Sequence, residues 1–359
     1  MPNELIVFLA TAVGSGILVG LIIKLSHYKS WYDHINDRKV HSGDIPRLGG
    51  VGFSFVFVVA AGILVFLNRE SDSAFRFLPC LAGICIIVVS GVWDDFHHMK
   101  PLGKFLIQVA AALCVVIPGY TFDRLFYFNE AFTANIPWLK AMIPWFKYII
   151  TFLWIVGMTN AVNLIDGIDA LAGGVSTIIA ITFAVIFSFF GETPAAELIC
   201  VAMSGAVAGF LVFNAPFPKA KIFMGDGGSQ FLGFTLALLP LLEENRTPAA
   251  LPVLYVAALL VIPIFDTIAA VWRRIRDKQN IYTPDRAHVH HKLMNLGLSV
   301  KQINAVLLGL QLVISVLVLL SVRFRGLLSL AVLGIAYLLA LAFFSVIHFM
   351  NRKISSENK

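Results

Sequence analysis

Residues 302–322, QINAVLLGLQLVISVLVLLSV, form an uncharged segment that is long enough for a helix to cross the hydrocarbon core of a membrane. Similar segments recur along the whole chain of 359 residues, of which 58% are hydrophobic and only 13% are charged. The mean hydropathy is +0.84. A soluble domain would need about twice this share of charged residues to cover its surface. The sequence therefore predicts an all-α polytopic integral membrane protein that forms a single domain, residues 1–359.

The apolar segments and the positive charges together predict a topology. Most of the 27 Lys and Arg residues fall in alternate connections and in the C-terminal tail, and such residues favour the cytoplasmic side. We therefore expect about eleven transmembrane helices, with the N-terminus outside and the C-terminus in the cytoplasm. The net charge of +6 follows from this asymmetry and gives no reason to expect a nucleic-acid partner. The eleven segments lie near 4–25, 48–68, 76–93, 104–119, 143–161, 168–190, 195–213, 228–242, 249–271, 302–322 and 327–350.

The histidines have the same asymmetry. All but one of the nine lie in the connections expected on the cytoplasmic side. A random distribution would not sort a titratable residue in this way, so we expect the chemistry on the cytoplasmic face. The active-site loops are predicted at residues 26–47, 94–104, 162–170, 214–227 and 272–301.

The first acidic motif lies in GVWDDFHHMKPLGKFLIQ, residues 91–108. Asp94 and Asp95 end an apolar segment, where two adjacent carboxylates repel each other and oppose the helix dipole unless a cation lies between them. A solvated helix end is the alternative explanation. Lys104, in the same motif, is expected to contact substrate.

A second acidic motif, TNAVNLIDGIDALAGG, spans residues 159–174. If it is helical, Asp166 and Asp169 project from one face, with Asn163 one turn earlier. Ordinary helix capping by Asn and Asp is the alternative.

The third motif, FNAPFPKAKIFMGDGGSQ, spans residues 213–230. It places Asp226 in a glycine turn before an apolar segment. Backbone N–H groups in such a turn attract anions, and one carboxylate there can hold Mg²⁺ bound to those anions. Capping alone would also explain Asp226.

The longest basic loop is RRIRDKQNIYTPDRAHVHHKL, residues 273–293. A zinc site is disfavoured because neither a cysteine nor a further acidic ligand occurs at the usual spacing. We interpret the loop as a phosphate-binding segment, with a merely solvated basic loop as the alternative. Asp266, inside an apolar segment, needs a partner. The candidate anion-binding residues of the loop are Arg286, His288, His290, His291 and Lys292.

Carboxylates and basic groups on one membrane face suit a magnesium diphosphate, because the acids hold the metal and the cations hold the remaining oxygens. A location in the bilayer suggests that the second reactant is a lipid.

At these residues the chain resembles the polyprenyl-phosphate N-acetylhexosamine-1-phosphate transferases. The similarity begins with RKVHSGDIPRLGG, residues 38–50, and continues in family order through WDD, NLIDGIDALAGG, FNAP, KIFMGDGGSQFLG and PDRAHVHH. It implies ten or eleven helices, a cytoplasmic active site, and Mg²⁺-dependent transfer of a sugar 1-phosphate from a UDP-sugar to polyprenyl phosphate, with release of UMP.

The resemblance also implies roles for single residues. Asp226 matches the magnesium-binding aspartate, and Mn²⁺ is expected to substitute for Mg²⁺. Asp94 and Asp95 match the paired acids near the lipid phosphate. The expected catalytic residues are Asp94, Asp95, Asp166, Asp169, His290 and His291, and the expected substrate contacts are Asn163, Asn214, Lys104, Arg286 and His288.

The sequence PDRAHVHHKL is more like the UDP-GlcNAc branch of the family than the MurNAc-pentapeptide branch, which carries three consecutive histidines followed by Phe-Glu. A departure from the family is Gly227, where many relatives have Ser or Thr. A lipid-linked sugar carrier is the competing class, but a carrier would place its ionisable groups near the membrane midplane. We expect the protein in the bacterial inner membrane, and a homodimer is a further expectation.

Overall fold

All regular secondary structure in the described residues is helical. The computed structural model describes residues 2–32, 45–68, 77–122, 137–191, 194–215, 217, 219–243, 252–280 and 287–357. The helices are α1 (Pro2–Lys29), α2 (Gly49–Leu67), α4 (Leu78–His97), α5 (Pro101–Val116), α7 (Pro137–Ile165), α8 (Leu171–Phe190), α9 (Pro194–Asn214), α10 (Gly225–Leu238), η1 (Leu239–Leu241), α11 (Val253–Leu259), α12 (Val261–Arg276), α13 (Val289–Asn295), α14 (Val300–Arg323) and α15 (Gly326–Glu357).

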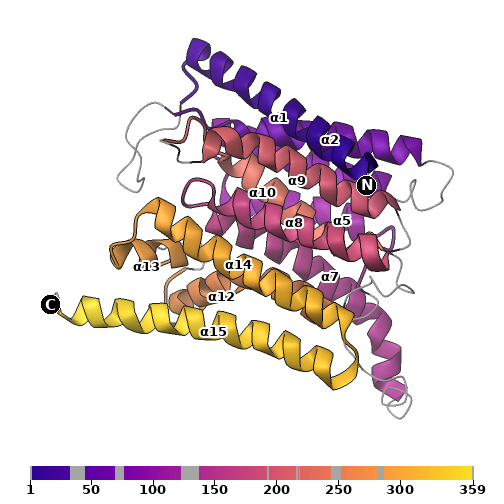
Figure 1. Cartoon of the computed structure of the whole chain (residues 1–359), viewed down its shortest axis with the longest axis vertical. Helices are drawn as coiled ribbons and strands as arrows, with labels where there is room; N and C mark the ends of the chain where they lie inside the picture. The colour runs from indigo at the N-terminus through magenta and orange to yellow at the C-terminus, as the bar shows by residue number, and fades with distance from the viewer. Residues whose placement is uncertain are drawn as a thin grey trace.

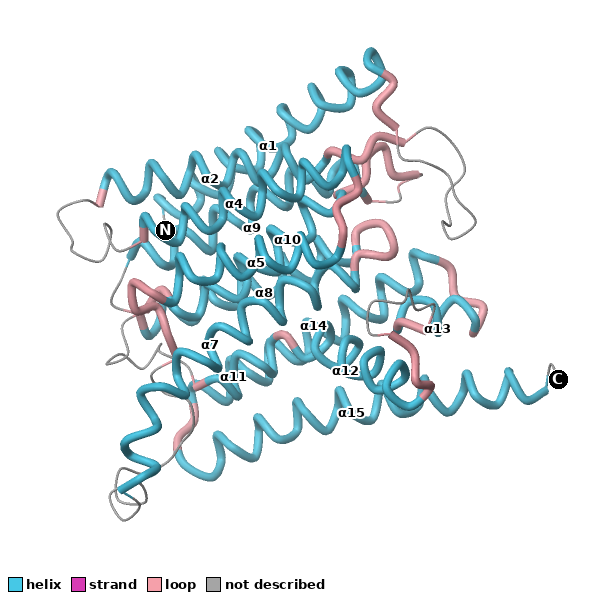
Figure 2. The backbone as a smooth tube through the Cα atoms, turned by 180° about the vertical axis from the view of Figure 1, so that it is seen from behind, coloured by secondary structure: helices cyan, strands magenta, loops and turns pink. Residues whose placement is uncertain are grey.

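The long helices lie side by side in one bundle, and the two ends of the chain lie at opposite ends of it (Figure 1). Seen from behind, the short helix α13 lies at the same end as the C-terminus (Figure 2). The acidic residues of the predicted motifs lie in the last turn of α4, in the connection after α7 and in the first turn of α10.

In the part of the chain that the structure describes, eight helices are long and apolar enough to cross a membrane, and the pair α11 and α12, bent by 86° at its break, would be a ninth. Helix α5 has 16 residues and helix α10 has 14, so both are short for a span. The protein is therefore an all-helical, polytopic membrane protein. Each of the eleven predicted segments coincides with a helix or with the bent pair. Eleven crossings and their orientation stay predictions.

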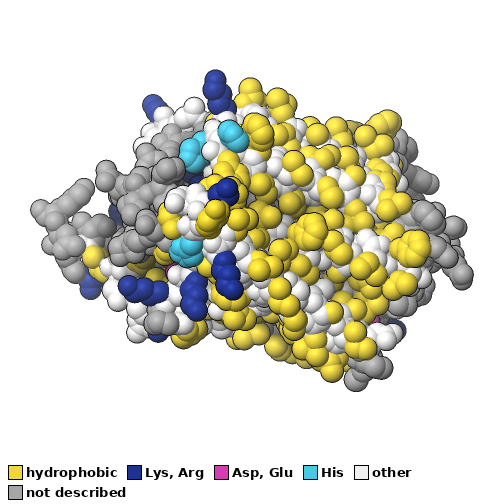
Figure 3. Space-filling view, turned by 90° about the horizontal axis from the view of Figure 1, so that it is seen from above, with side chains coloured by type: hydrophobic (Ala, Val, Ile, Leu, Met, Phe, Trp, Pro, Cys, Tyr) yellow, Lys and Arg dark blue, Asp and Glu magenta, His cyan; other side chains and the backbone are white. Residues whose placement is uncertain are grey.

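The outer surface has the character of a lipid-facing surface. Large apolar side chains are well exposed, such as Leu21 at 55% and Leu327 at 85%. Figure 3 shows apolar side chains covering most of one face, while Lys, Arg and His gather at one end. Apolar surface of this extent is stable against hydrocarbon, where only the ends of the bundle meet water.

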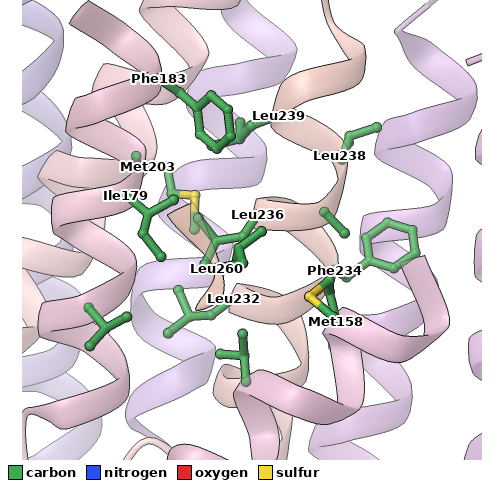
Figure 4. Packing of buried hydrophobic residues seen from close by; sticks show 14 of the residues in the cluster. Met158, Ile179, Phe183, Met203, Leu232, Phe234, Leu236, Leu238, Leu239 and Leu260 are labelled. Carbon is green, nitrogen blue, oxygen red and sulfur yellow. The ribbon is translucent and has the colours of Figure 1, made fainter. Parts of the chain in front are cut away.

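Helix α10 is the centre of the bundle. Every residue from Gly225 to Leu238 except Asp226 is buried, and the helix packs against α2, α4, α7 and α8. Figure 4 shows Leu232 and Leu236 among apolar side chains of neighbouring helices, including Ile179 and Met203. A central helix that is buried on all sides therefore carries one charged residue, in its first turn.

Glycines let two neighbours approach that first turn closely. A Cβ atom on Gly91 of α4 would collide with the backbone of Gly227, and one on Gly50 of α2 would collide with the backbone of Gly228. Only glycine permits such contact between backbones. The close approach brings the ends of α2 and α4 against the start of α10, where Asp226 lies.

Candidate functional site

Two chain segments that are far apart in sequence make the frame of the site. Phe223 N–H donates to the carbonyl of Pro46 at 2.8 Å. In return, Gly49 N–H donates to the carbonyl of Phe223 at 2.9 Å, and Gly50 N–H donates to the carbonyl of Met224 at 2.8 Å. Gly225 then turns the chain into α10 with φ of +76°, a backbone conformation that glycine adopts readily. The frame places Arg47 beside Asp226.

Asp226 lies between two cations. Arg47 Nη2 donates to Asp226 Oδ1 at 2.8 Å, and Lys104 Nζ donates to Asp226 Oδ2 at 2.8 Å. Lys104 also pairs with Asp94. The Asp226 side chain is 25% exposed, whereas Asp94 is 3% exposed. A ligand can therefore reach Asp226 more easily than Asp94.

Asp95 stabilises the start of helix α10. Its carboxylate accepts the backbone N–H groups of Asp226 and Gly227 at 2.8 and 3.2 Å, and Arg47 Nε lies 3.2 Å from its Oδ1. The first N–H groups of a helix lack partners within the helix, so a carboxylate from another helix acts as the cap. Capping by Asp226 itself, the alternative raised by the sequence, is not what the structure shows: its side-chain oxygens face the two cations.

Asp94 closes the end of its own helix. It accepts the N–H of Met99 at 2.6 Å, and His98 between them has φ of +48°. Helix α4 thus ends in a tight turn that keeps both adjacent acids at the site and leads directly into α5, which carries Lys104.

The loop between α7 and α8 brings the second acidic motif to the same place. Asp166 lies one residue beyond α7. Desolvation by the surrounding protein and the nearby charges of Asp226 and Asp169 raise the pKa of Asp166 to about 7, even though part of its surface still meets solvent. Asp166 therefore shares one electrostatic environment with Asp226.

Amide side chains hold this loop in place. Asn214 accepts the N–H of Ala170 at 2.8 Å and donates to the carbonyl of Ile222 at 2.9 Å. Asn304 of α14 donates to the carbonyl of Asp169 at 2.8 Å. The predicted substrate contact Asn214 thus joins the second and third motifs through backbone groups. Asn163 donates to Ser229 of α10 at 2.7 Å.

The histidine loop approaches the α7–α8 loop. His288 Nδ1 lies 2.7 Å from Asp266 Oδ2, and Val289 N–H donates to Asp266 Oδ1 at 2.7 Å. His290 is buried against Gly167, where a Cβ atom would collide with the imidazole ring. Desolvation, with a smaller effect of His291, lowers the pKa of His290 to about 3, so this imidazole is neutral at physiological pH. Arg286 lies outside the described residues.

The carboxylates fit a hard divalent cation. Within the described residues, no three His, Cys, Asp or Glu side chains converge closely enough to hold a metal by themselves. Mg²⁺ uses one or two carboxylates together with phosphate oxygens and water. Two cations, Arg47 and Lys104, pair with the group of four carboxylates formed by Asp94, Asp95, Asp166 and Asp226. The oxygen-only donors are those that Mg²⁺ or Mn²⁺ prefers.

An apolar pocket of about 560 Å³ lies beside the acids. It is lined by residues of α4, of α5 and of the turn between them: Cys85, Ile86, Val89, Ser90, Trp93, Met99 and Ile107. Trp93 and Met99 flank Asp94 and its turn. The apolar pocket therefore lies directly beside the charged residues of the candidate site.

The motifs predicted one site that contains Asp94, Asp95, Asp166, Asp226 and Lys104, and the structure places these residues in one cluster. Two features of the site were not predicted from the sequence. Arg47 was not named as a site residue, although it lies in the family-like stretch RKVHSGDIPRLGG. The partner of Asp266 was also missed, because nothing in the sequence links it to His288. The chemical roles of all these residues stay predictions.

Comparison with known proteins gives a consistent result. The family model described as glycosyl transferase family 4 matches residues 77–243. A probable undecaprenyl-phosphate N-acetylglucosaminyl 1-phosphate transferase of Bacillus subtilis (strain 168) is 36% identical, over 83% of this chain and 79% of its own. Undecaprenyl-phosphate alpha-N-acetylglucosaminyl 1-phosphate transferases of Escherichia coli (strain K12) and Salmonella typhi are 30% and 31% identical, over 75% and 84% of this chain and 71% and 76% of their own. The chain therefore belongs to glycosyl transferase family 4, as the resemblance in its motifs predicted.

Proposed function

We propose that this protein transfers N-acetylglucosamine 1-phosphate from UDP-GlcNAc to undecaprenyl phosphate and releases UMP. The observation that carries the proposal is the cluster of four carboxylates and two cations around Asp226, at one end of a membrane-embedded bundle. The names of the relatives give the lipid acceptor and the sugar phosphate. The UDP donor rests on the resemblance of PDRAHVHH to the UDP-GlcNAc branch.

In this reaction an oxygen of the lipid phosphate attacks the phosphorus that carries the sugar. The new P–O bond forms as the P–O–P bond breaks, and UMP leaves with the electron pair. The acceptor oxygen is already anionic, so positioning and charge neutralisation are the main requirements. Arg47 and Lys104 lie within reach of the same carboxylate and are suited to bind phosphate oxygens once that carboxylate is engaged elsewhere.

Asp226 would hold Mg²⁺, with the negative charges of Asp94 and Asp166 supporting it. Bound Mg²⁺ supplies charge neutralisation on the diphosphate. Asp95 keeps the first turn of α10, and with it Asp226, in a fixed position. The apolar pocket beside Asp94 suits the approach of a lipid from the bilayer.

The proposal includes the finer topology. Helices α5 and α10 and the bent pair α11 and α12 complete eleven crossings. Lys, Arg and His gather at one end of the face drawn in Figure 3, and this end would be cytoplasmic by the preference of positive charge for that side. The membrane would be the bacterial inner membrane, because UDP-sugars are made in the cytoplasm.

The test is turnover by the purified protein with radiolabelled UDP-GlcNAc, undecaprenyl phosphate and Mg²⁺. We expect label in a lipid-soluble product, none of it without the lipid phosphate, and loss of turnover in EDTA that Mg²⁺ or Mn²⁺ restores. UDP-MurNAc-pentapeptide serves as the alternative donor. Turnover of that donor alone would reject GlcNAc, and no transfer from either donor would reject the function.

A further inference from the structure

His290 has the environment of a residue that awaits a ligand. Its side chain is 2% exposed, and neither ring nitrogen has a hydrogen-bond partner among the described residues. A neutral imidazole carries one N–H donor and one acceptor, and leaving both unsatisfied in a buried position costs free energy. The ring lies against Gly167, next to Asp166 in the candidate site.

Asp266 decides where this imidazole lies. It is 2% exposed and holds the histidine loop at two points, His288 Nδ1 and Val289 N–H, both at 2.7 Å. A carboxylate only accepts, so the proton of His288 is on Nδ1 and its tautomer is fixed. Val289 is the first residue of α13, so the same carboxylate sets the start of the helix that carries His290. The rings of His288 and His290 are stacked with an interplanar angle of 5°.

The break between α11 and α12 brings Asp266 to the loop. The two helices meet at 86°, and Gln311 of α14 donates to the carbonyl of Leu259 at 3.0 Å, a carbonyl at the break. Satisfying this buried group stabilises a bend inside an apolar bundle. Helix α12 then packs against α7, whose end leads into the Asp166 loop.

We propose that Asp266 is a positioning residue, which holds His288 and the first turn of α13 so that His290 donates its N–H to a phosphate oxygen of the nucleotide sugar. This inference rests on the proposed function. The nucleotide is the favoured source of phosphate because His290 approaches from the side of α12 and α13, whereas the apolar pocket suited to a lipid lies between α4 and α5. A neutral donor at this place adds binding without adding charge that would compete with a metal.

The experiment compares Asp266→Asn with the wild type in the full-length protein. Asparagine keeps an acceptor for Val289 N–H but presents an amide group to His288, so the fixed tautomer is lost while the shape is kept. We expect the Kd and KM for UDP-GlcNAc to rise roughly tenfold to hundredfold, the loss expected for one charge-assisted hydrogen bond. The KM for undecaprenyl phosphate and the melting temperature should stay near wild-type values.

Three further variants make the test specific. Thr267→Val, one residue along α12, removes a hydroxyl without a partner among the described residues and should behave like the wild type. His288→Gln should reproduce the Asp266→Asn defect, and the double variant should be no worse than either, because the two residues act in series. Asp266→Glu, which keeps the charge, should recover part of the affinity.

The outcomes separate the two proposals. A wild type that neither binds nor turns over UDP-GlcNAc would reject the proposed function, and this inference with it. If the wild type is functional and Asp266→Asn has the same Kd and KM for UDP-GlcNAc as Thr267→Val, the inference about Asp266 is rejected and the proposed function stands. A rise confined to the KM for undecaprenyl phosphate, or additive losses in the double variant, would also reject it.

Discussion

The carboxylate of Asp95, a residue of α4, caps the start of helix α10. Two backbone N–H groups and Arg47 contact its two oxygens, and its side chain is 2% exposed. Losing a helix cap costs about 0.5–2 kcal/mol. Asp95→Ala should therefore lower the melting temperature in detergent, and Asp95→Asn, which keeps one acceptor, should lower it less.

The control for this prediction is Asp277→Ala. Asp277 pairs with its neighbour Arg276 at the exposed end of α12, and exposed pairs contribute little. If Asp95→Ala melts at the same temperature as the Asp277 variant, Asp95 does not hold helix α10.

His290 allows a prediction on pH. An unfolded histidine has a pKa of about 6.5, and burial lowers the pKa of His290 in the folded protein to about 3. The unfolded chain binds the proton more tightly, so this group's contribution to stability is present above pH 6.5 and is lost as the pH falls toward 3. Lowering the pH from 7.5 to 5 should therefore reduce the melting temperature more in the wild type than in His290→Gln. Equal reductions in the two proteins would show that His290 titrates normally.

Contact between glycines controls how the elements meet at the site. Gly91→Ala places a Cβ atom against the backbone of Gly227. Helix α10 can relieve this clash only by a movement that also shifts Asp226. Overpacking of this kind costs about 1–3 kcal/mol. We expect a lower melting temperature and lower turnover together.

Gly62→Ala in α2 is the matched control for Gly91→Ala. A Cβ atom there meets nothing within 4 Å, and alanine is the better helix former, so its melting temperature should equal or exceed that of the wild type. A Gly91→Ala protein that melts and turns over like the Gly62 variant would contradict the close packing of α4 on α10.

The sequence predicted where the long helices lie, but it did not predict where a helix is broken. Apolar length alone predicted every long helix, because hydrocarbon permits few other conformations of the backbone. The short helix α13 was missed, since it lies inside the predicted loop 272–301. The 86° bend at Leu260 was not predicted. It depends in part on Gln311, a residue 52 positions away from Leu259 that meets the break only in the folded bundle.

For the site too, the sequence did not predict the contacts between residues that lie far apart along the chain. The acidic motifs could be found because charge in an apolar chain is conspicuous. Arg47 and Asp226 are 179 positions apart, and the capping of α10 by Asp95 spans 131 positions. Such pairs follow from how α2, α4 and α10 pack, so patterns within one segment could not reveal them.

The orientation of the bundle gives a prediction for the whole protein. In a background without its four cysteines, a single cysteine at Lys278, which is exposed just beyond α12, should react with an impermeant reagent only from the cytoplasmic side. A cysteine at Glu244 should react only from outside. The reverse labelling would overturn the proposed orientation and the cytoplasmic site.

The central claim is that the carboxylates around Asp226 form a metal-dependent phosphotransfer site, and the most direct test is UMP release by purified wild-type and Asp226→Asn protein. Asparagine removes the charge that would hold Mg²⁺, whose neutralisation is worth several kcal/mol in the transition state, so release should fall about 1,000-fold or more. Arg47 and Lys104 keep Asp95 and Asp94 as partners, so the melting temperature should change little. Near-normal UMP release by the Asp226→Asn protein, with wild-type release dependent on undecaprenyl phosphate, would contradict the account.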